Sequence, residues 1–171
     1  MNFITVYTDA SFCDTTKKGG WGAYIRHDCG MFEMSGGLPT VNNCTEAEFK
    51  AAINGLHCIS RLIPSDPVII VLVTDCASVH LVLNSIILNE GVSYKRKRNL
   101  DHALGVFREW LKKLPVTARV KVNKVKAHTG GSDPRSYANK RADKLARTEM
   151  KLLRSHALEL SREKRDESGN N

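Results

Sequence analysis

Four acidic residues stand in sequence contexts where their carboxylates can act together. They are Asp9 in YTDAS, Glu48 in TEAEFKAAI, Asp75 in VLVTDC and Asp143 in NKRADKLA. Three come from the ends of apolar strands or the start of a helix, where a folded sheet can gather distant groups. Clustered carboxylates repel unless a cation holds them, and Mg²⁺ prefers oxygen ligands. The pattern therefore predicts a divalent-metal site, in which two ions can clamp the attacking and leaving oxygens of a phosphodiester.

The elements that must position these acids follow from hydrophobic periodicity. It predicts strands over 3–10, 19–27, 31–37, 68–73 and 119–125, and helices over 44–62, 77–88, 99–114 and from Asn139 onward. Residues 68–73 are continuously apolar, as in a strand covered on both faces, and Asp75 lies just past its end. Residues 119–125 alternate with period two, which is typical of an edge strand with one solvated, basic face.

The order βββαβααβα predicts one α/β domain with a five-stranded mixed sheet, in which a three-stranded antiparallel meander joins two parallel strands and helices flank the sheet. We place this domain at residues 1–150. Residues 128–137 (HTGGSDPRSY) are expected to form a turn-rich loop before the last helix. Residues 151–171 are expected to be a basic amphipathic extension whose last residues, DESGNN, form a disordered tail.

The charge balance favours a polyanionic partner. Lys and Arg number 26 against 18 Asp and Glu, which gives a net charge of +8. Phosphates release counterions to such side chains, so nucleic acid is favoured over the alternative of simple solubility charge. With 171 residues, 42% of them hydrophobic, the chain is long enough for one buried core and too short for two.

Cysteine usage and hydropathy indicate the compartment. The five cysteines are odd in number and have no CxxC spacing, which argues against a disulfide framework or a zinc site and predicts reduced thiols. No run of 18 apolar residues occurs, and the first residues lack a charged n-region. We expect a soluble, cytoplasmic protein without membrane contact.

Six short segments occur in a characteristic order. They are Thr8-Asp9-Ala10-Ser11, Gly19-Gly20-Trp21-Gly22, Glu48-Phe49-Lys50-Ala51, Thr74-Asp75-Cys76, Val125-Lys126-Ala127-His128 and the N-x-x-x-D-x-L-A run from Asn139 to Ala146. In these segments the chain resembles the type 1 ribonuclease H family, whose members cut the RNA strand of an RNA–DNA hybrid with divalent metal. The resemblance rests on all six segments occurring in the correct order.

The resemblance implies a ribonuclease H-like fold and an endoribonuclease that leaves 5′-phosphate and 3′-hydroxyl ends. It implies two Mg²⁺ ions, with Mn²⁺ as a substitute, held by Asp9, Glu48, Asp75 and Asp143. It gives His128 a part in proton transfer or product release. It also implies that the protein is a monomer that binds an RNA–DNA hybrid. As alternatives, Asp9 and Asp75 would only cap neighbouring helices, and Asp143 would be an ordinary first-turn acid of its helix. His128 would then be an ordinary exposed loop histidine.

Glu46 and Glu48 compete for the third metal-ligand position, because both flank the apolar stripe of the first helix. Periodicity cannot choose between them. The family pattern favours Glu48, since residues 51–53 follow it at the expected distance. Glu46 would then be a solvated first-turn acid that complements the helix dipole.

Nucleic-acid contacts also follow from the resemblance. It implies that Ser11, Phe12, Asn42, Asn43 and Asn139 contact the hybrid, that the run Lys95, Arg96, Lys97 and Arg98 grips the DNA strand, and that Asn99 binds a phosphate. For the asparagines at 42 and 43 a turn-forming role is the alternative, and for Asn99 it is a helix cap. Trp21 and Trp110 are expected in the core. The rival functions are a nuclease for another structured nucleic acid and a noncatalytic hybrid-binding module.

Overall fold

The computed structural model describes residues 2–63, 67–90, 98–126 and 133–168, without the side chains of 98–99 and 163–168. Its elements are β1 (Asn2–Cys13), β2 (Lys18–His27), β3 (Gly30–Leu38), α1 (Cys44–Cys58), β4 (Val68–Thr74), α2 (Ala77–Ile87), α3 (Arg98–Lys112), β5 (Ala118–Lys124) and α4 (Pro134–Ser168). The predicted order βββαβααβα and the single five-stranded mixed sheet are both confirmed.

The sheet has the strand order β3-β2-β1-β4-β5. β1, β2 and β3 pair antiparallel, whereas β1–β4 and β4–β5 are parallel pairs. The shared ladder of β1 and β4 ends at Tyr7 and Val73, so Asp9 and Asp75 lie just beyond it at the same edge. β1 itself is longer than the sequence indicated, because its pairing with β2 continues to Cys13.

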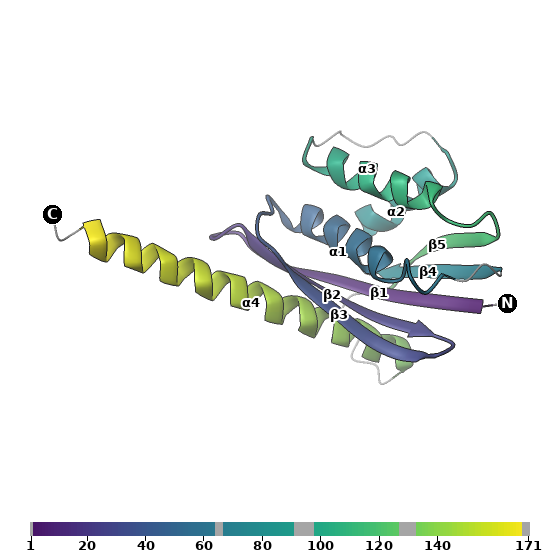
Figure 1. Ribbon diagram of the computed structural model, residues 1–171, viewed down its shortest axis with the longest axis horizontal. Helices are drawn as coiled ribbons and strands as arrows, with labels where there is room; N and C mark the ends of the chain where they lie inside the picture. Colours follow the sequence, from purple (N-terminus) through teal and green to yellow (C-terminus); the bar gives the residue numbers. More distant parts are fainter. Residues whose placement is uncertain (1, 64–66, 91–97, 127–132, 169–171) are drawn as a thin grey trace.

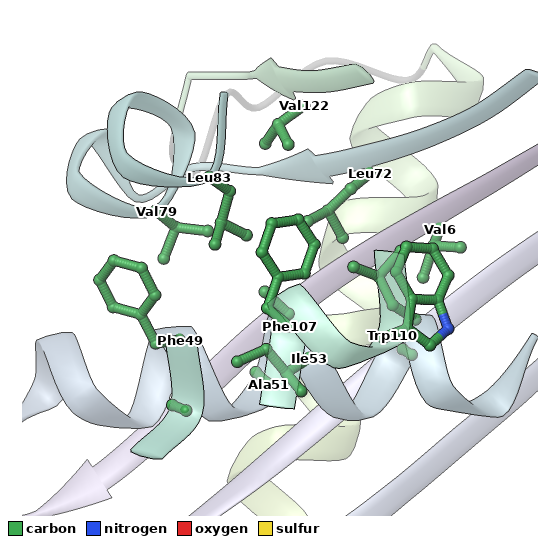
Figure 2. Packing of buried hydrophobic residues seen from close by; sticks show 14 of the residues in the cluster. Val6, Phe49, Ala51, Ile53, Leu72, Val79, Leu83, Phe107, Trp110 and Val122 are labelled. Atoms are coloured by element: carbon green, nitrogen blue, oxygen red, sulfur yellow. The ribbon is translucent and has the colours of Figure 1, made fainter. Parts of the chain in front are cut away.

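Helices cover both faces of the sheet (Figure 1). α1 lies on one face, with α2 and α3 beside it, and α4 crosses the other face. The larger core lies under α1 and α3, where Phe49, Leu72, Leu83 and Phe107 come together from four elements (Figure 2). Both tryptophans are buried, as predicted; the ring of Trp110 stacks on Phe107 at 6.2 Å between centroids.

Two glycines of β2 allow α4 to lie directly on the sheet. A Cβ atom at Gly22 would stand 2.3 Å from the carbonyl oxygen of Ala142, and one at Gly20 would stand 2.2 Å from that of Ala146. Glycine is therefore required at both positions for this close approach of backbone to backbone. Because Gly22 pairs with Asp9 in the sheet, the contact also brings the α4 segment that contains Asp143 towards Asp9.

The last helix begins earlier than the sequence pattern indicated. The predicted loop 128–137 is wrong for residues 134–137, which form the first turn of α4. Asp133 accepts hydrogen bonds from the backbone amides of Arg135 (2.9 Å) and Ser136 (3.2 Å), and Pro134 stands at the first helical position. Asp143 consequently lies in the third turn of the helix and not at its start.

At its other end, α4 continues to Ser168, and its C-terminal half extends past the sheet in Figure 1. The expected disordered tail is therefore wrong for residues 166–168, which are helical. Leu152, Leu158 and Leu160 are exposed on this part of the helix. The division into a domain and an extension at residue 150 stays a prediction.

β5 forms one edge of the sheet, as predicted, and exposes the basic side chains of Arg119 and Lys121. The side chain of Asn84 on α2 bonds both backbone groups of Val122, donating to its oxygen at 2.9 Å and accepting from its nitrogen at 3.2 Å. This contact satisfies part of the free strand edge. All five cysteines are free. Their redox state stays a prediction. Within the described residues, no helix is long and apolar enough to span a bilayer.

Candidate active site

Three of the four predicted metal ligands meet in one cluster. Oxygen atoms of Asp9, Glu48 and Asp75 all lie within 4.8 Å of one another. Asp9 comes from β1, Glu48 from the first turns of α1, and Asp75 directly follows β4. Asp9 is buried and the other two are half-buried. The parallel pairing of β1 with β4 and the packing of α1 on the sheet therefore assemble this acidic triad, Asp9–Glu48–Asp75, from distant parts of the chain.

Short-range hydrogen bonds fix the triad locally. The Oδ1 atom of Asp9 accepts a 2.8 Å bond from the backbone amide of Ala10. After β4, the hydroxyl of Thr74 accepts from the amide of Cys76 at 3.1 Å and so shapes the turn that carries Asp75. Asn43 caps α1 by accepting from the amide of Glu46 at 2.9 Å, which sets the first turn of the helix.

Burial and like-charge repulsion oppose ionisation within the triad. Burial raises the pKa of Asp9 to about 7, and the negative charge of Asp75 adds to the rise. Burial likewise raises the pKa of Glu48 to about 9, with the charges on Asp9 and Asp75 adding to it. Like charges at this distance disfavour joint ionisation, so the fully charged triad forms only with a positive partner.

The residues present fit a hard divalent metal. The Oε2 atom of Glu48 is buried and has no hydrogen-bond partner among the described residues. A buried carboxylate oxygen without a partner is costly, and coordination to a cation removes that cost. The donor atoms of the triad are all carboxylate oxygens, the type that Mg²⁺ and Mn²⁺ prefer.

Asp143 approaches the triad but is not one of its three members. Its charge contributes to the raised pKa of Asp9. Its Oδ1 atom accepts a 2.7 Å bond from Nε of Arg147, one helical turn further along α4. Sequence reasoning missed Arg147, although an Asp–Arg pair spaced by four residues is a recognisable helix signal.

Glu46 does not compete with Glu48 for the cluster. Glu46 is only 4% exposed, so its predicted solvated position is wrong. Its carboxylate accepts hydrogen bonds from the amide and the side chain of Asn42 (3.1 and 2.7 Å) and pairs with Lys50 at 2.8 Å. Burial raises the pKa of Glu46, but these bonds outweigh burial and hold the pKa below its usual value. Of the two glutamates, Glu48 is the one whose carboxylate belongs to the acidic triad.

Comparisons with known proteins give the family. A model of the family described as RNase H matches residues 1–151. The chain belongs to the ribonuclease H family. A ribonuclease H from Chlorobium phaeovibrioides is 29% identical to it over 146 residues, which cover 84% of this chain and 92% of the relative.

Solved ribonuclease H structures share the fold. The N-terminal RNase H domain of a Mycobacterium tuberculosis protein superposes with a TM-score of 0.68 at 14% identity, covering 92% of this chain and 99% of the other. LC11-RNase H1, solved in complex with an RNA/DNA hybrid, superposes with a TM-score of 0.66 at 14% identity, covering 87% and 97%. At such low identity the likeness establishes the ribonuclease H fold and no residue roles.

The residues predicted to contact the minor groove belong to the end of β1 and to the segment that leads into α1. Ser11 and Phe12 occupy the end of β1 opposite Gly20 and Gly19 and are partly exposed. Asn42 and Asn43 both hydrogen-bond to Glu46, as described above, so both have structural roles in addition to any contact with substrate. Their binding roles stay predictions.

A hollow of about 270 Å³ lies beside Asp143. Its lining residues are Val125, Lys126, Asp133, Arg135, Ser136, Asn139, Lys140 and Asp143. Asn139 is 7% exposed, and its Oδ1 atom is buried without a hydrogen-bond partner in the described part of the chain. The cations Lys126, Arg135 and Lys140 were not among the predicted site residues.

Several predicted residues cannot be placed. His128 and the basic run Lys95, Arg96 and Lys97 lie outside the described residues. Arg98 and Asn99 begin α3, but their side chains are outside the described part too. The roles that the family resemblance gave them stay predictions.

Proposed function

We propose that this ribonuclease H family member hydrolyses the RNA strand of RNA–DNA hybrids with two divalent metal ions, Mg²⁺ or Mn²⁺, and leaves 5′-phosphate and 3′-hydroxyl ends. The observation that carries the proposal is the acidic triad, with the raised pKa values of Asp9 and Glu48 and the buried Oε2 of Glu48, which has no partner among the described residues. The hybrid as substrate is supported by family membership and by the complex of LC11-RNase H1 with an RNA/DNA hybrid.

The metal ions would be held by the triad, with Asp143 completing the set from α4. Bound divalent ions lower the pKa of an attacking water and neutralise charge on the leaving oxygen. The charges of Asp75 and of Asp143 both raise the pKa of Asp9, so Asp9 is the residue suited to serve two ions. Arg147 orients the carboxylate of Asp143 through their 2.7 Å bond.

The remaining roles concern the substrate. The 2′-hydroxyl groups distinguish an RNA strand from DNA in the minor groove. Asn139 offers a buried carbonyl oxygen at the hollow beside Asp143, which can accept a hydrogen bond from such a hydroxyl. His128 would move a proton or assist product release, as the family resemblance implies. The monomeric state and the cytoplasmic location stay predictions.

A substrate panel tests the proposal. The same sequence is prepared as RNA–DNA hybrid, double-stranded RNA, double-stranded DNA and a DNA junction, with the RNA labelled where present. In Mg²⁺ the wild type should cut only the hybrid among the four substrates, and chromatography should show 5′-phosphate products. Asp75→Asn is the inactive control. Cleavage of the junction or the double-stranded RNA in preference to the hybrid would sink the substrate assignment, and equal activity of Asp75→Asn would sink the site.

A further inference from the structure

One half of a sheet face is left open by α4. The helix packs on β1, β2 and β3, and the same face of β4 and β5 holds a second hollow of about 470 Å³. Its floor includes Tyr7, Val73 and Asn123, which are neighbours in the strand register. We call this hollow the edge trough. It lies outside the acidic triad and has no part in the function proposed above.

The walls of the edge trough are cationic. Lys124 from β5, Arg135 from α4 and His80 from α2 line it, and no carboxylate is among the described residues of its lining. Both Lys124 and Arg135 are exposed. Neither has an ion-pair partner within the described ranges of the chain, so their two positive charges are available to a ligand.

The edge trough continues into the active site. Val125 and Arg135 line both the trough and the hollow that contains Asn139 and Asp143. The hollow is lined by Lys126 and Lys140 and by the further carboxylate of Asp133. A strand that leaves the triad through this hollow can therefore reach the cations of the trough. Cations along a groove that adjoins a nuclease centre are the arrangement that follows a phosphate backbone.

We propose that the edge trough binds backbone phosphates of the RNA strand where that strand continues, unpaired, beyond the hybrid. The inference rests on the proposed function, because it is the RNA strand that passes over the carboxylates. The contact is electrostatic and independent of sequence. It would favour hybrids that carry a single-stranded RNA tail over blunt ones.

The experiment compares the binding of blunt hybrids with that of hybrids bearing an RNA tail at the 5′ or the 3′ end. Affinity is measured in EDTA over a range of salt concentrations. For one of the tails, the wild-type plot of log affinity against log salt should be steeper than for the blunt hybrid by about 1.4, roughly 0.7 for each cation. The double variant Lys124→Gln/Arg135→Gln should lose this increment.

The matched control is Arg61→Gln/Lys113→Gln, which removes two exposed positive charges just after α1 and α3; neither residue lines the trough. It should keep the increment. A wild type whose slope is the same with and without either tail, or a Lys124→Gln/Arg135→Gln protein that keeps the increment, would overturn the inference. Cleavage of the blunt hybrid by the wild type in Mg²⁺ is recorded separately. If the wild type cleaves the hybrid but its salt slope does not increase with a tail, only the proposal about the trough fails. If the slope increases with a tail but the hybrid is not cleaved, the trough proposal is supported and the proposed function fails.

Discussion

Glu46 and Glu48 lie two positions apart on α1, and their carboxylates have opposite surroundings. Glu46 is bonded to Asn42 and Lys50, which hold its pKa low. Glu48 is buried beside Asp9 and Asp75, with its Oε2 atom unpartnered in the described structure and its pKa raised to about 9. One glutamate is therefore neutralised by Lys50 of the protein itself, whereas the other has no cationic partner among the described residues.

Paired substitutions should separate the two glutamates. Glu48→Gln removes a metal ligand, so hybrid cleavage in Mg²⁺ should fall by at least about 100-fold. Glu46→Gln keeps an acceptor for Asn42 but loses the pair with Lys50, so it should retain activity and lose about 1 kcal/mol of unfolding free energy. Cleavage rates and urea denaturation measure the two effects. The reverse pattern would make Glu46 the ligand.

The triad should destabilise the metal-free protein as the pH rises. The folded pKa of Asp9, about 7, is above its unfolded value, so the folded state binds more protons and loses stability between about pH 4 and pH 7. Glu48 extends the loss towards pH 9. In EDTA at pH 8, Asp9→Asn should therefore be more stable than the wild type by on the order of 2 kcal/mol, and at pH 4 it should not.

Thermal denaturation in EDTA across this pH range measures the difference. Asp28→Asn, an exposed acid in the turn between β2 and β3, is the control and should leave the pH dependence unchanged. Equal stability of Asp9→Asn and the wild type at pH 8 would show that the triad is not under electrostatic strain.

Metal binding should release protons from the triad. Because Asp9 and Glu48 hold protons at neutral pH without metal, a divalent ion must displace them, and its affinity should increase with pH. Saturating Mn²⁺ should raise the Tm more at pH 8 than at pH 6. Calorimetry in buffers of different ionisation enthalpy would count the protons. A Tm increase that is the same at both pH values would contradict this account.

The close packing of α4 on β2 should not tolerate a methyl group added at Gly22. Gly22→Ala would place Cβ 2.3 Å from a backbone oxygen of α4, and the overpacking should cost about 3 kcal/mol of unfolding free energy. Displacing α4 also moves Asp143, so activity should fall further than in a merely less stable protein. Gly105→Ala is the control, because its added Cβ meets no described atom within 4 Å outside its own stretch of helix, and alanine favours the helix by roughly 0.5–1 kcal/mol.

Arg147 should tune the acid limb of the activity profile. Its positive charge lowers the pKa of Asp9 and pairs with Asp143, so Arg147→Gln should move the acid limb of kcat/KM upward by a fraction of a pH unit. Arg154→Gln, an exposed arginine further along α4, is the matched control and should leave the limb in place. An unshifted profile for Arg147→Gln would leave Arg147 with a structural role alone.

Much of this arrangement could be predicted from the sequence. The continuously apolar run 68–73 predicted a buried strand, and the parallel pairing of that strand with β1 is what brings Asp75 beside Asp9. The helical spacing of α1 predicted which of its faces is buried. These features depend on local periodicity, which a single sequence displays directly.

The remaining features depend on contacts that local periodicity does not report. The burial of Glu46 requires Asn42 and Lys50 to surround it. The position of Asp143 was misplaced because the Asp133–Pro134 cap signal was assigned to a loop, although it is a recognised helix start. The full length of β1 depends on β2, since the last residues of β1 are held by that neighbour alone.

Anomalous scattering from crystals grown with Mn²⁺ tests the central claim most directly, because it locates the metal without reference to activity. The account predicts a peak bonded to carboxylate oxygens of Asp9, Glu48 and Asp75 at about 2.0–2.3 Å, and, with hybrid bound, a second peak between Asp9 and Asp143. Manganese found elsewhere on the protein, with the triad carboxylates bonded only to protein or solvent, would contradict it.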